Sequence, residues 1–208
     1  MDFCGPYCTS TEGQRYVLVF VDQFTKMVEL VPCGDQLSST VAQCFYERII
    51  CRYGTPRALL SDRGPQFKSQ LIELLCATFG VNKIFSSAYY PQGDGFAERF
   101  MRTMNNSLSV LCRSAPKTWD TFLPGLAFAY NVTEHAATGL TPFFLNSGRV
   151  PRFPRGGRAT GGRPQKVKKT TPGTFSPSLP TAPPQAPAHG LDSRTSSLLR
   201  TGGSVVVV

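Results

Sequence analysis

The sequence predicts an α/β domain, a mixed sheet flanked by helices, followed by a tail of different composition. Segments with strand patterns alternate with segments that carry apolar residues at helical spacing. The chain of 208 residues is long enough for one hydrophobic core of ordinary size plus additional sequence. We place the domain at residues 1–151 and the tail at residues 152–208.

Four segments have the pattern of β-strands. Residues 15–22 form an unbroken run of mostly β-branched and aromatic residues, which is typical of a buried strand. Residues 26–32 alternate and follow closely, so the two segments predict a hairpin. Short apolar runs at residues 58–61 and 82–86 predict two further strands.

Four longer segments have the pattern of helices, at residues 38–53, 68–79, 96–112 and 118–131. In the second, one face is predicted to be apolar and consists of Leu71, Leu74, Leu75 and Thr78. In the third, an apolar stripe is formed by Ala97, Phe100, Met101, Met104, Leu108 and Leu111. Residues 91–95, with two glycines, are predicted to form a loop before that helix.

The net charge of +9 lies almost entirely in the tail. Residues 1–150 hold 13 basic and 12 acidic residues, whereas residues 151–208 hold nine basic residues and one acidic residue. Residues 151–208 also hold nine of the 17 prolines, so the tail is predicted to be disordered. Seven of its basic residues fall between Arg152 and Lys169 and would attract phosphate groups or acidic partners. A solvated tail without a partner is the alternative.

Several classes of protein are excluded by simple patterns. No apolar run approaches the about 20 residues of a membrane span, so no membrane partner is expected. The first residues, with Asp2 followed by Cys-Gly-Pro, do not form a signal segment. The seven cysteines are odd in number and widely spaced, which predicts reduced thiols in an intracellular protein.

Three carboxylates stand at the ends of predicted elements. Asp62 ends a strand, Glu98 lies in the first turn of the long helix, and Asp2 precedes the hairpin. Singly, each has an ordinary explanation as a turn residue or as a complement to the helix dipole. They are separated by 59 and 35 residues. Three carboxylates supply the hard oxygen ligands that metal-dependent phosphoryl transfer needs.

With these carboxylates and their surroundings, the sequence resembles the catalytic cores of retroviral and long-terminal-repeat retrotransposon integrases, most closely those of gypsy-type elements. The matching motifs run in order along residues 1–152: Met1–Pro6 (MDFCGP), Val21–Lys26 (VDQFTK), Tyr53–Pro56 (YGTP), Leu60–Phe67 (LSDRGPQF), Tyr90–Arg99 (YPQGDGFAER) and Thr138–Phe143 (TGLTPF). The resemblance implies a ribonuclease H-like fold.

The resemblance also implies a function and a site. Asp2, Asp62 and Glu98 would be the catalytic residues and would hold two Mg²⁺ or Mn²⁺ ions. The reaction would be removal of nucleotides from a DNA 3′ end followed by strand transfer into target DNA. The implied partner is double-stranded DNA, both element ends and target, bound by a homo-oligomer that enters the nucleus from the cytoplasm.

Four polar residues near Glu98 are candidates for DNA contacts. Arg102 and Asn105 share the polar face of the long helix with Glu98, and Gln92 and Arg99 lie beside it in the sequence. A solvated helix face is the alternative explanation for them.

Two other functions share these features. The first is a non-catalytic nucleic-acid-binding remnant of a retrotransposon integrase, which would keep the fold without the activity. The second is a ribonuclease H acting on RNA–DNA hybrids, although the 35-residue spacing and the Tyr-Pro-Gln motif argue against it. Because Asp2 stands so early in the sequence, we also expect its strand to be shortened at the N-terminal side and the chain alone to be marginally stable and weakly active.

Overall fold

The computed structural model describes residues 1–86 and 91–152, and the side chains of residues 91–98 lie outside this description. Three strands form an antiparallel sheet in the order β1 (Asp2–Cys4), β2 (Tyr16–Val21) and β3 (Val28–Cys33). The β2–β3 hairpin confirms the pairing predicted from residues 15–32. The tail, with its predicted disorder and its basic run, lies outside the described residues.

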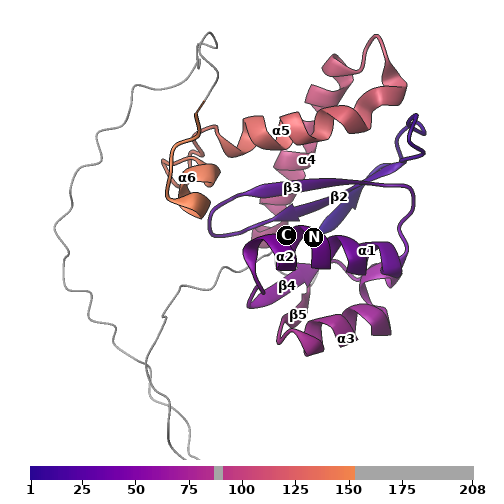
Figure 1. Ribbon diagram of the computed structural model, residues 1–208, viewed down its shortest axis with the longest axis vertical. Coiled ribbons are helices and arrows are strands. Elements are labelled where there is room, and N and C mark those ends of the chain that lie inside the picture. Colours follow the sequence, from indigo (N-terminus) through magenta and orange to yellow (C-terminus); the bar gives the residue numbers. More distant parts are fainter. Residues whose placement is uncertain (87–90, 153–208) are drawn as a thin grey trace, which may run out of the picture. The chain divides into compact units, whose positions relative to one another are not determined.

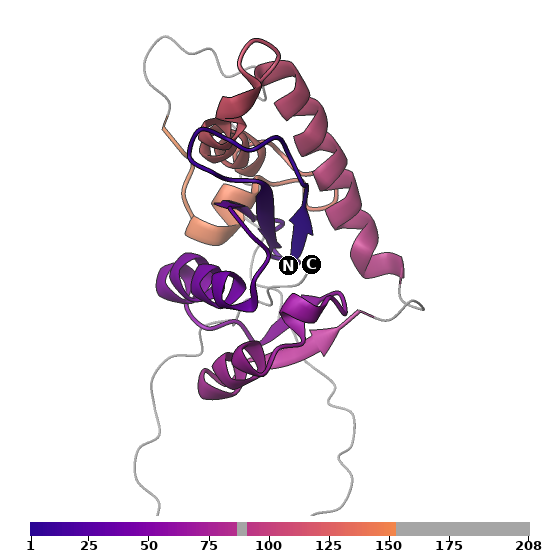
Figure 2. The same cartoon turned by 90° about the vertical axis from the view of Figure 1, so that its right-hand side faces the viewer.

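The centre of this sheet is β2, and both of its faces are covered. Its residues from Val17 to Val21 are at most 1% exposed, although successive side chains point to opposite faces. Figure 2 shows how this is achieved, since the long helix α4 (Pro91–Leu111) and the helix α1 (Ser38–Cys44) lie on opposite sides of the sheet. An unbroken apolar strand therefore needs helices on both sides, as the sequence pattern indicates.

A second, parallel pair of strands, β4 (Ala58–Ser61) and β5 (Asn82–Phe85), stands beside the first sheet. The prediction of one mixed sheet is wrong in this respect, because the antiparallel strands β1–β3 and the parallel strands β4 and β5 form two separate ladders. A hydrogen bond joins the two ladders: the amino group of Met1 donates to the carbonyl of Leu60 at 2.7 Å. That the strand of Asp2 is shortened stays a prediction.

The predicted helix at residues 38–53 is confirmed as one continuous helical segment of changing pitch. It consists of α1 (Ser38–Cys44), a π-helical stretch η1 (Phe45–Ile50) and α2 (Cys51–Tyr53). It ends at Gly54, whose φ of +87° suits glycine and stops the helix.

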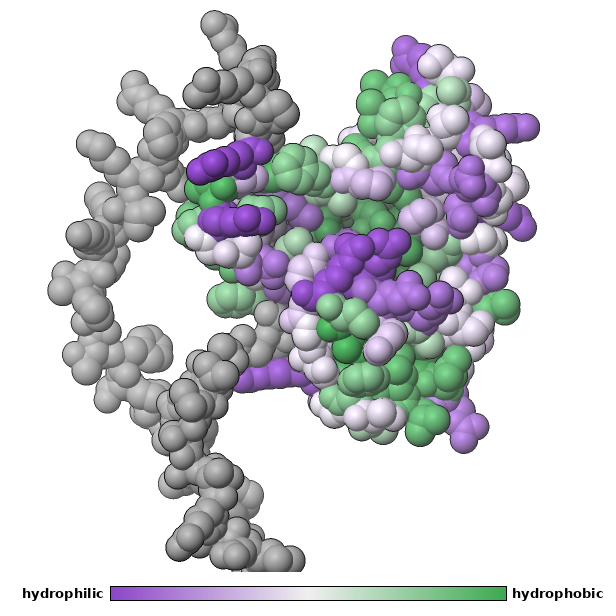
Figure 3. Space-filling model, in the orientation of Figure 1, coloured by the Kyte–Doolittle hydropathy of each residue, from purple (hydrophilic) through white to green (hydrophobic). Residues whose placement is uncertain are grey.

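The next helix buries a different face from the one predicted. After a short 3₁₀ turn, η2 (Pro65–Phe67), helix α3 (Gln70–Thr78) buries Ile72 and Cys76. The predicted core residues Leu71 and Leu74 are instead 45% and 64% exposed. They contribute to the hydrophobic area that Figure 3 shows over this helix.

The long helix α4 (Pro91–Leu111) begins earlier than predicted. The expectation of a loop at residues 91–95 is wrong, since the helix starts at Pro91, where proline's fixed φ and missing N–H are tolerated. The central part of the predicted stripe is confirmed, because Phe100, Met104 and Leu108 are buried. Leu111 is 44% exposed, and Cys112 takes its place in the core.

Three shorter helices complete the domain: η3 (Pro116–Phe122), α5 (Leu123–Asn131) and α6 (Pro142–Ser147). In η3, the indole of Trp119 is buried and donates a hydrogen bond to the carbonyl of Cys8. Helix α6 was not expected from the sequence; the Thr141 hydroxyl accepts from the Phe144 amide at its start. Figure 1 shows α5 and α6 at the opposite end of the domain from β5 and α3.

Candidate metal and nucleic-acid site

Asp2 lies on β1, opposite Val19 of β2. It is half-buried, and its carboxylate accepts a hydrogen bond of 2.7 Å from the amide of Phe3. The Phe3 ring stacks on Phe67 with 5.8 Å between ring centroids. Because Phe67 is fully buried, this contact anchors β1 to the turn that follows β4.

Asp62 is the first residue after β4, as predicted. Its side chain is exposed, and its carboxylate accepts a hydrogen bond of 3.0 Å from the amide of Gly64. This hydrogen bond, between a carboxylate and the backbone amide two residues later, fixes the conformation of the turn. The preceding residue, Ser61, is buried and donates from its hydroxyl to the carbonyl of Asp62.

The structure brings the Asp2 and Asp62 segments together at two points. The Met1–Leu60 hydrogen bond lies one residue before Asp2 and two residues before Asp62. The Phe3–Phe67 stacking lies just beyond them on the other side. Both carboxylates therefore belong to adjoining segments at one junction of the two strand ladders.

Glu98 lies on helix α4, and its side chain is outside the described residues. The helix is nevertheless tied to the segment that follows Asp2. Asn105, two helical turns beyond Glu98, accepts a hydrogen bond of 2.5 Å from the Tyr7 hydroxyl, and the Cys4 thiol lies 3.6 Å from its oxygen. Burial raises the pKa of Tyr7, so this hydroxyl stays a proton donor.

The predicted DNA-contacting residues have different surroundings. Arg99 and Arg102 are exposed on α4, where DNA could reach them, and Gln92 lies outside the described side chains. Asn105 is also exposed, but its carboxamide oxygen is engaged with Tyr7. A contact between Asn105 and DNA stays a prediction. The contact that the structure shows, with Tyr7, joins α4 to the N-terminal part of the domain.

Two basic side chains near these elements have no role predicted from the sequence. Lys83 of β5 donates to the hydroxyl of Ser61, next to Asp62. Burial lowers the pKa of Lys83 to about 8, while electrostatic interactions with Cys76 and Asp62 oppose this shift. His135 has a lowered pKa because of burial and the charges of Lys26 and Arg99. Neither arrangement had a signal in the sequence, because each depends on strand register or on helix packing.

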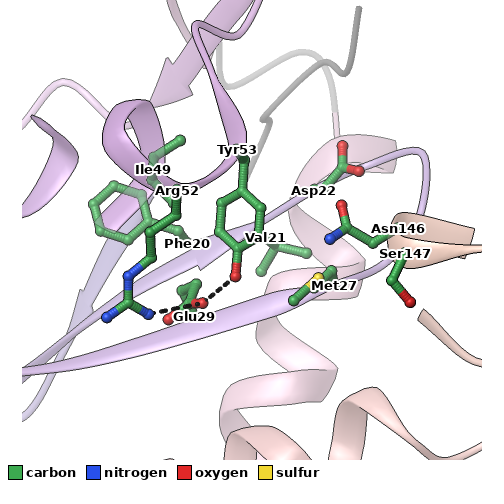
Figure 4. A pocket seen from close by; sticks show the side chains of 10 residues that line it. All are labelled: Phe20, Val21, Asp22, Met27, Glu29, Ile49, Arg52, Tyr53, Asn146 and Ser147. Atoms are coloured by element: carbon green, nitrogen blue, oxygen red, sulfur yellow. Dashed lines mark hydrogen bonds and ion pairs between the residues drawn. The ribbon is translucent and has the colours of Figure 1, made fainter. Parts of the chain in front are cut away.

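A cavity of about 400 Å³ opens elsewhere on the domain, between β2, β3, α2 and α6. Figure 4 shows Glu29 at its wall, where it accepts a hydrogen bond from Tyr53 and pairs with Arg52 at 3.6 Å. None of the predicted site residues lines it. Glu29 and Arg52 pair with each other, and the Asp22 carboxylate accepts hydrogen bonds from Thr25, so we do not assign the chemistry to this cavity.

The described residues leave the metal site incomplete. Among them, no group of three or more His, Cys, Asp or Glu side chains is placed to hold a metal ion, but the Glu98 carboxylate is not included. All seven cysteines carry free thiols. No helix in the described part of the chain is both long and apolar enough to cross a membrane.

Comparison with known proteins identifies relatives of this arrangement. Residues 1–91 match the family of integrase core domains. The gypsy retrotransposon integrase-like protein 1 of Bos taurus is 33% identical over 154 residues, which are 74% of this chain. The chain spans 30% of that relative's length.

Solved structures show the same fold. The catalytic core of BIV integrase superposes with a TM-score of 0.58 and 26% identity, over 70% of this chain and 90% of that one. The catalytic core of HTLV-2 integrase, solved in complex with magnesium, gives a TM-score of 0.54 at 20% identity, over 63% and 84% of the two chains. The ribonuclease H-like architecture implied by the sequence motifs is thus supported. Residues 1–91 therefore match an integrase core domain, and the chain is similar to the integrases of retroviruses and gypsy-type retrotransposons.

Proposed function

We propose that this domain is a metal-dependent polynucleotidyl transferase that processes DNA 3′ ends and joins them to target DNA. The observation that carries the proposal is the junction between the two strand ladders. There the Met1–Leu60 hydrogen bond and the Phe3–Phe67 stacking hold the segments of Asp2 and Asp62 together. The Tyr7–Asn105 hydrogen bond ties the helix of Glu98 to the same region.

The donor set fits a hard divalent cation. Asp2, Asp62 and Glu98 would supply only carboxylate oxygens, which suit Mg²⁺ or Mn²⁺ better than softer metals. The HTLV-2 relative binds magnesium, which supports the choice. Two bound ions would stabilise the negative charge on the attacking and leaving oxygens of an in-line displacement.

The protein's own groups keep these carboxylates in place. The Gly64 amide holds the carboxylate of Asp62, and the Phe3 amide holds that of Asp2. Because both bonds come from backbone amides close in sequence, the carboxylates are oriented before any ligand arrives. The attacking group would be water for end processing and the DNA 3′ hydroxyl for joining, so no nucleophilic side chain is required.

Double-stranded DNA is the proposed partner, with Arg99 and Arg102 contacting its phosphates from the exposed face of α4. We further propose that the protein acts as a homo-oligomer in the nucleus.

A strand-transfer assay tests the proposal directly. Labelled double-stranded oligonucleotides are incubated with the full chain and plasmid DNA in Mg²⁺, in Mn²⁺ or in EDTA. We expect joined products with either metal and none in EDTA. DNA binding without any metal-dependent cleavage or joining would favour the second candidate, a non-catalytic nucleic-acid-binding remnant.

The basic run of the tail is predicted to add affinity for DNA without sequence preference. Truncation after Pro151 should weaken DNA binding and flatten its salt dependence, because each neutralised phosphate contributes about −0.9 to the slope of log K against log salt. Fluorescence anisotropy at several salt concentrations measures both quantities. Truncation after Lys169 keeps the seven basic residues and should leave the slope unchanged. Equal slopes for the two truncations would show that the basic run does not contact DNA.

A further inference from the structure

Lys83 is held in place by three contacts at the edge of the candidate site. It lies on β5 opposite Leu59 of β4. Its ammonium group donates to the Ser61 hydroxyl and, at 3.3 Å, to the carbonyl of Ile84. The same group stands 4.2 Å from the centroid of the Phe85 ring. A long side chain with three such contacts is held in one orientation, so its charge has a defined position.

The contact with Ser61 places the ammonium group one residue from Asp62 in the chain. Ser61, which receives the bond from Lys83, immediately precedes Asp62 and is only 1% exposed. Its hydroxyl donates in turn to the Asp62 carbonyl at 2.9 Å. The Asp62 charge acts on the Lys83 ammonium and favours its protonated form. A positive charge is thus held near the backbone of Asp62, one of the proposed metal ligands.

Stability does not account for this lysine. A half-buried ammonium loses hydration, which is why the pKa of Lys83 falls below its usual range. An apolar side chain of similar length could pack against Phe85 without that loss. The charge is therefore more easily understood from its position beside Asp62 than from packing.

We propose that Lys83 sets the divalent-cation affinity of the site, because its fixed positive charge repels a cation bound by Asp62. The inference rests on the proposed role of Asp62 as a metal ligand. Lys83 is a positioning residue here, since it acts on the cation through the electrostatic field at Asp62 and ligates nothing. A charge this close to a ligand changes cation affinity even in a partly solvated site.

Binding of Mn²⁺ to the full chain at about pH 7 tests the proposal. The electron paramagnetic resonance signal of free Mn²⁺ reports the unbound fraction. Lys83→Met should bind Mn²⁺ about 3–10-fold more tightly than the native chain, because the repulsion is gone. Lys83→Arg keeps the charge and should retain the native affinity. Lys117→Met, which removes an exposed lysine from η3, is the matched control and should change nothing.

Two further variants separate the possible failures. Lys83→Gln keeps a donor for Ser61 without the charge, so it should bind as tightly as Lys83→Met, and it serves if the methionine variant does not fold. Asp62→Asn should weaken Mn²⁺ binding. If Asp62→Asn weakens binding while the neutral Lys83 variants bind no more tightly than the native chain, the inference about Lys83 is overturned and Asp62 remains a ligand. If Asp62→Asn leaves binding unchanged, the proposed metal site itself is wrong.

Discussion

Asp62→Asn and Glu98→Gln are each expected to abolish metal-dependent DNA joining while leaving the domain folded. Each change replaces one carboxylate oxygen of the proposed metal site by an amide nitrogen, which does not bind Mg²⁺. Losing several kcal/mol of transition-state stabilisation lowers the rate by about 10³-fold or more, since each ~1.4 kcal/mol is a factor of ten. The strand-transfer assay with Mg²⁺ measures this loss.

The fold should tolerate these changes, and this separates catalysis from stability. Asp62 is exposed, and an asparagine oxygen can still accept the hydrogen bond from Gly64. We therefore expect the free energy of unfolding to change by no more than about 0.5 kcal/mol. Binding to DNA in EDTA should also persist, because neither change removes a positive charge.

Glu73→Gln is the matched control. Glu73 lies exposed on α3 and the change has the same effect on charge and size as Glu98→Gln. Its joining activity should equal that of the native chain. Native-like joining by Asp62→Asn or Glu98→Gln would contradict the assignment of the three carboxylates.

The strands could be predicted from the sequence because their signal is local. The run from Val17 to Val21 has no polar side chain, which is typical of a strand covered on both faces, and the structure shows this. The short strand β4 is bounded by a proline before it and by Asp62 after it. Its limits at residues 58–61 agree with the prediction.

The helices show where local patterns stop being sufficient. In α3, apolar residues occur on more than one face, and the predicted face with Leu71 and Leu74 is the exposed one. The choice is made by the neighbouring α1 and β5 segments, which contact the helix on the side where Ile72 and Cys76 join the core. At the start of α4, Gly93 and Gly95 favour a loop by propensity, but the helix extends through them.

The site could be predicted only in part for the same reason. The order and spacing of Asp2, Asp62 and Glu98 are properties of the sequence, and so is the position of Asp62 after a strand. The link between Lys83 and Ser61 depends on the parallel register of β4 and β5, which pairs residues 24 positions apart, such as Leu59 and Lys83. The contact of Tyr7 with Asn105 spans 98 positions. Neither has a local pattern that would reveal it.

Asn131→Ala is expected to cause the largest loss of stability among single polar substitutions in the described core. Asn131 ends helix α5 and is 6% exposed. Its carboxamide donates to the carbonyl of Val28 and accepts from the amide of Val28, each at 2.9 Å. Val28 begins β3, an edge strand of the antiparallel sheet, so this side chain satisfies backbone groups that no strand reaches.

Alanine at this position would leave both backbone groups of Val28 buried without partners. Each such group costs about 1–3 kcal/mol, so the free energy of unfolding should fall by about 2–5 kcal/mol. For a domain of this size the melting temperature should drop by about 5–15 °C. Asn131→Asp keeps the acceptor but loses the donor and buries a charge, so it should also destabilise the domain. Asn106→Ala, on the exposed face of α4, is the control and should melt within about 2 °C of the native chain. If Asn131→Ala has the same melting temperature as that control, the carboxamide does not hold α5 to the edge of β3.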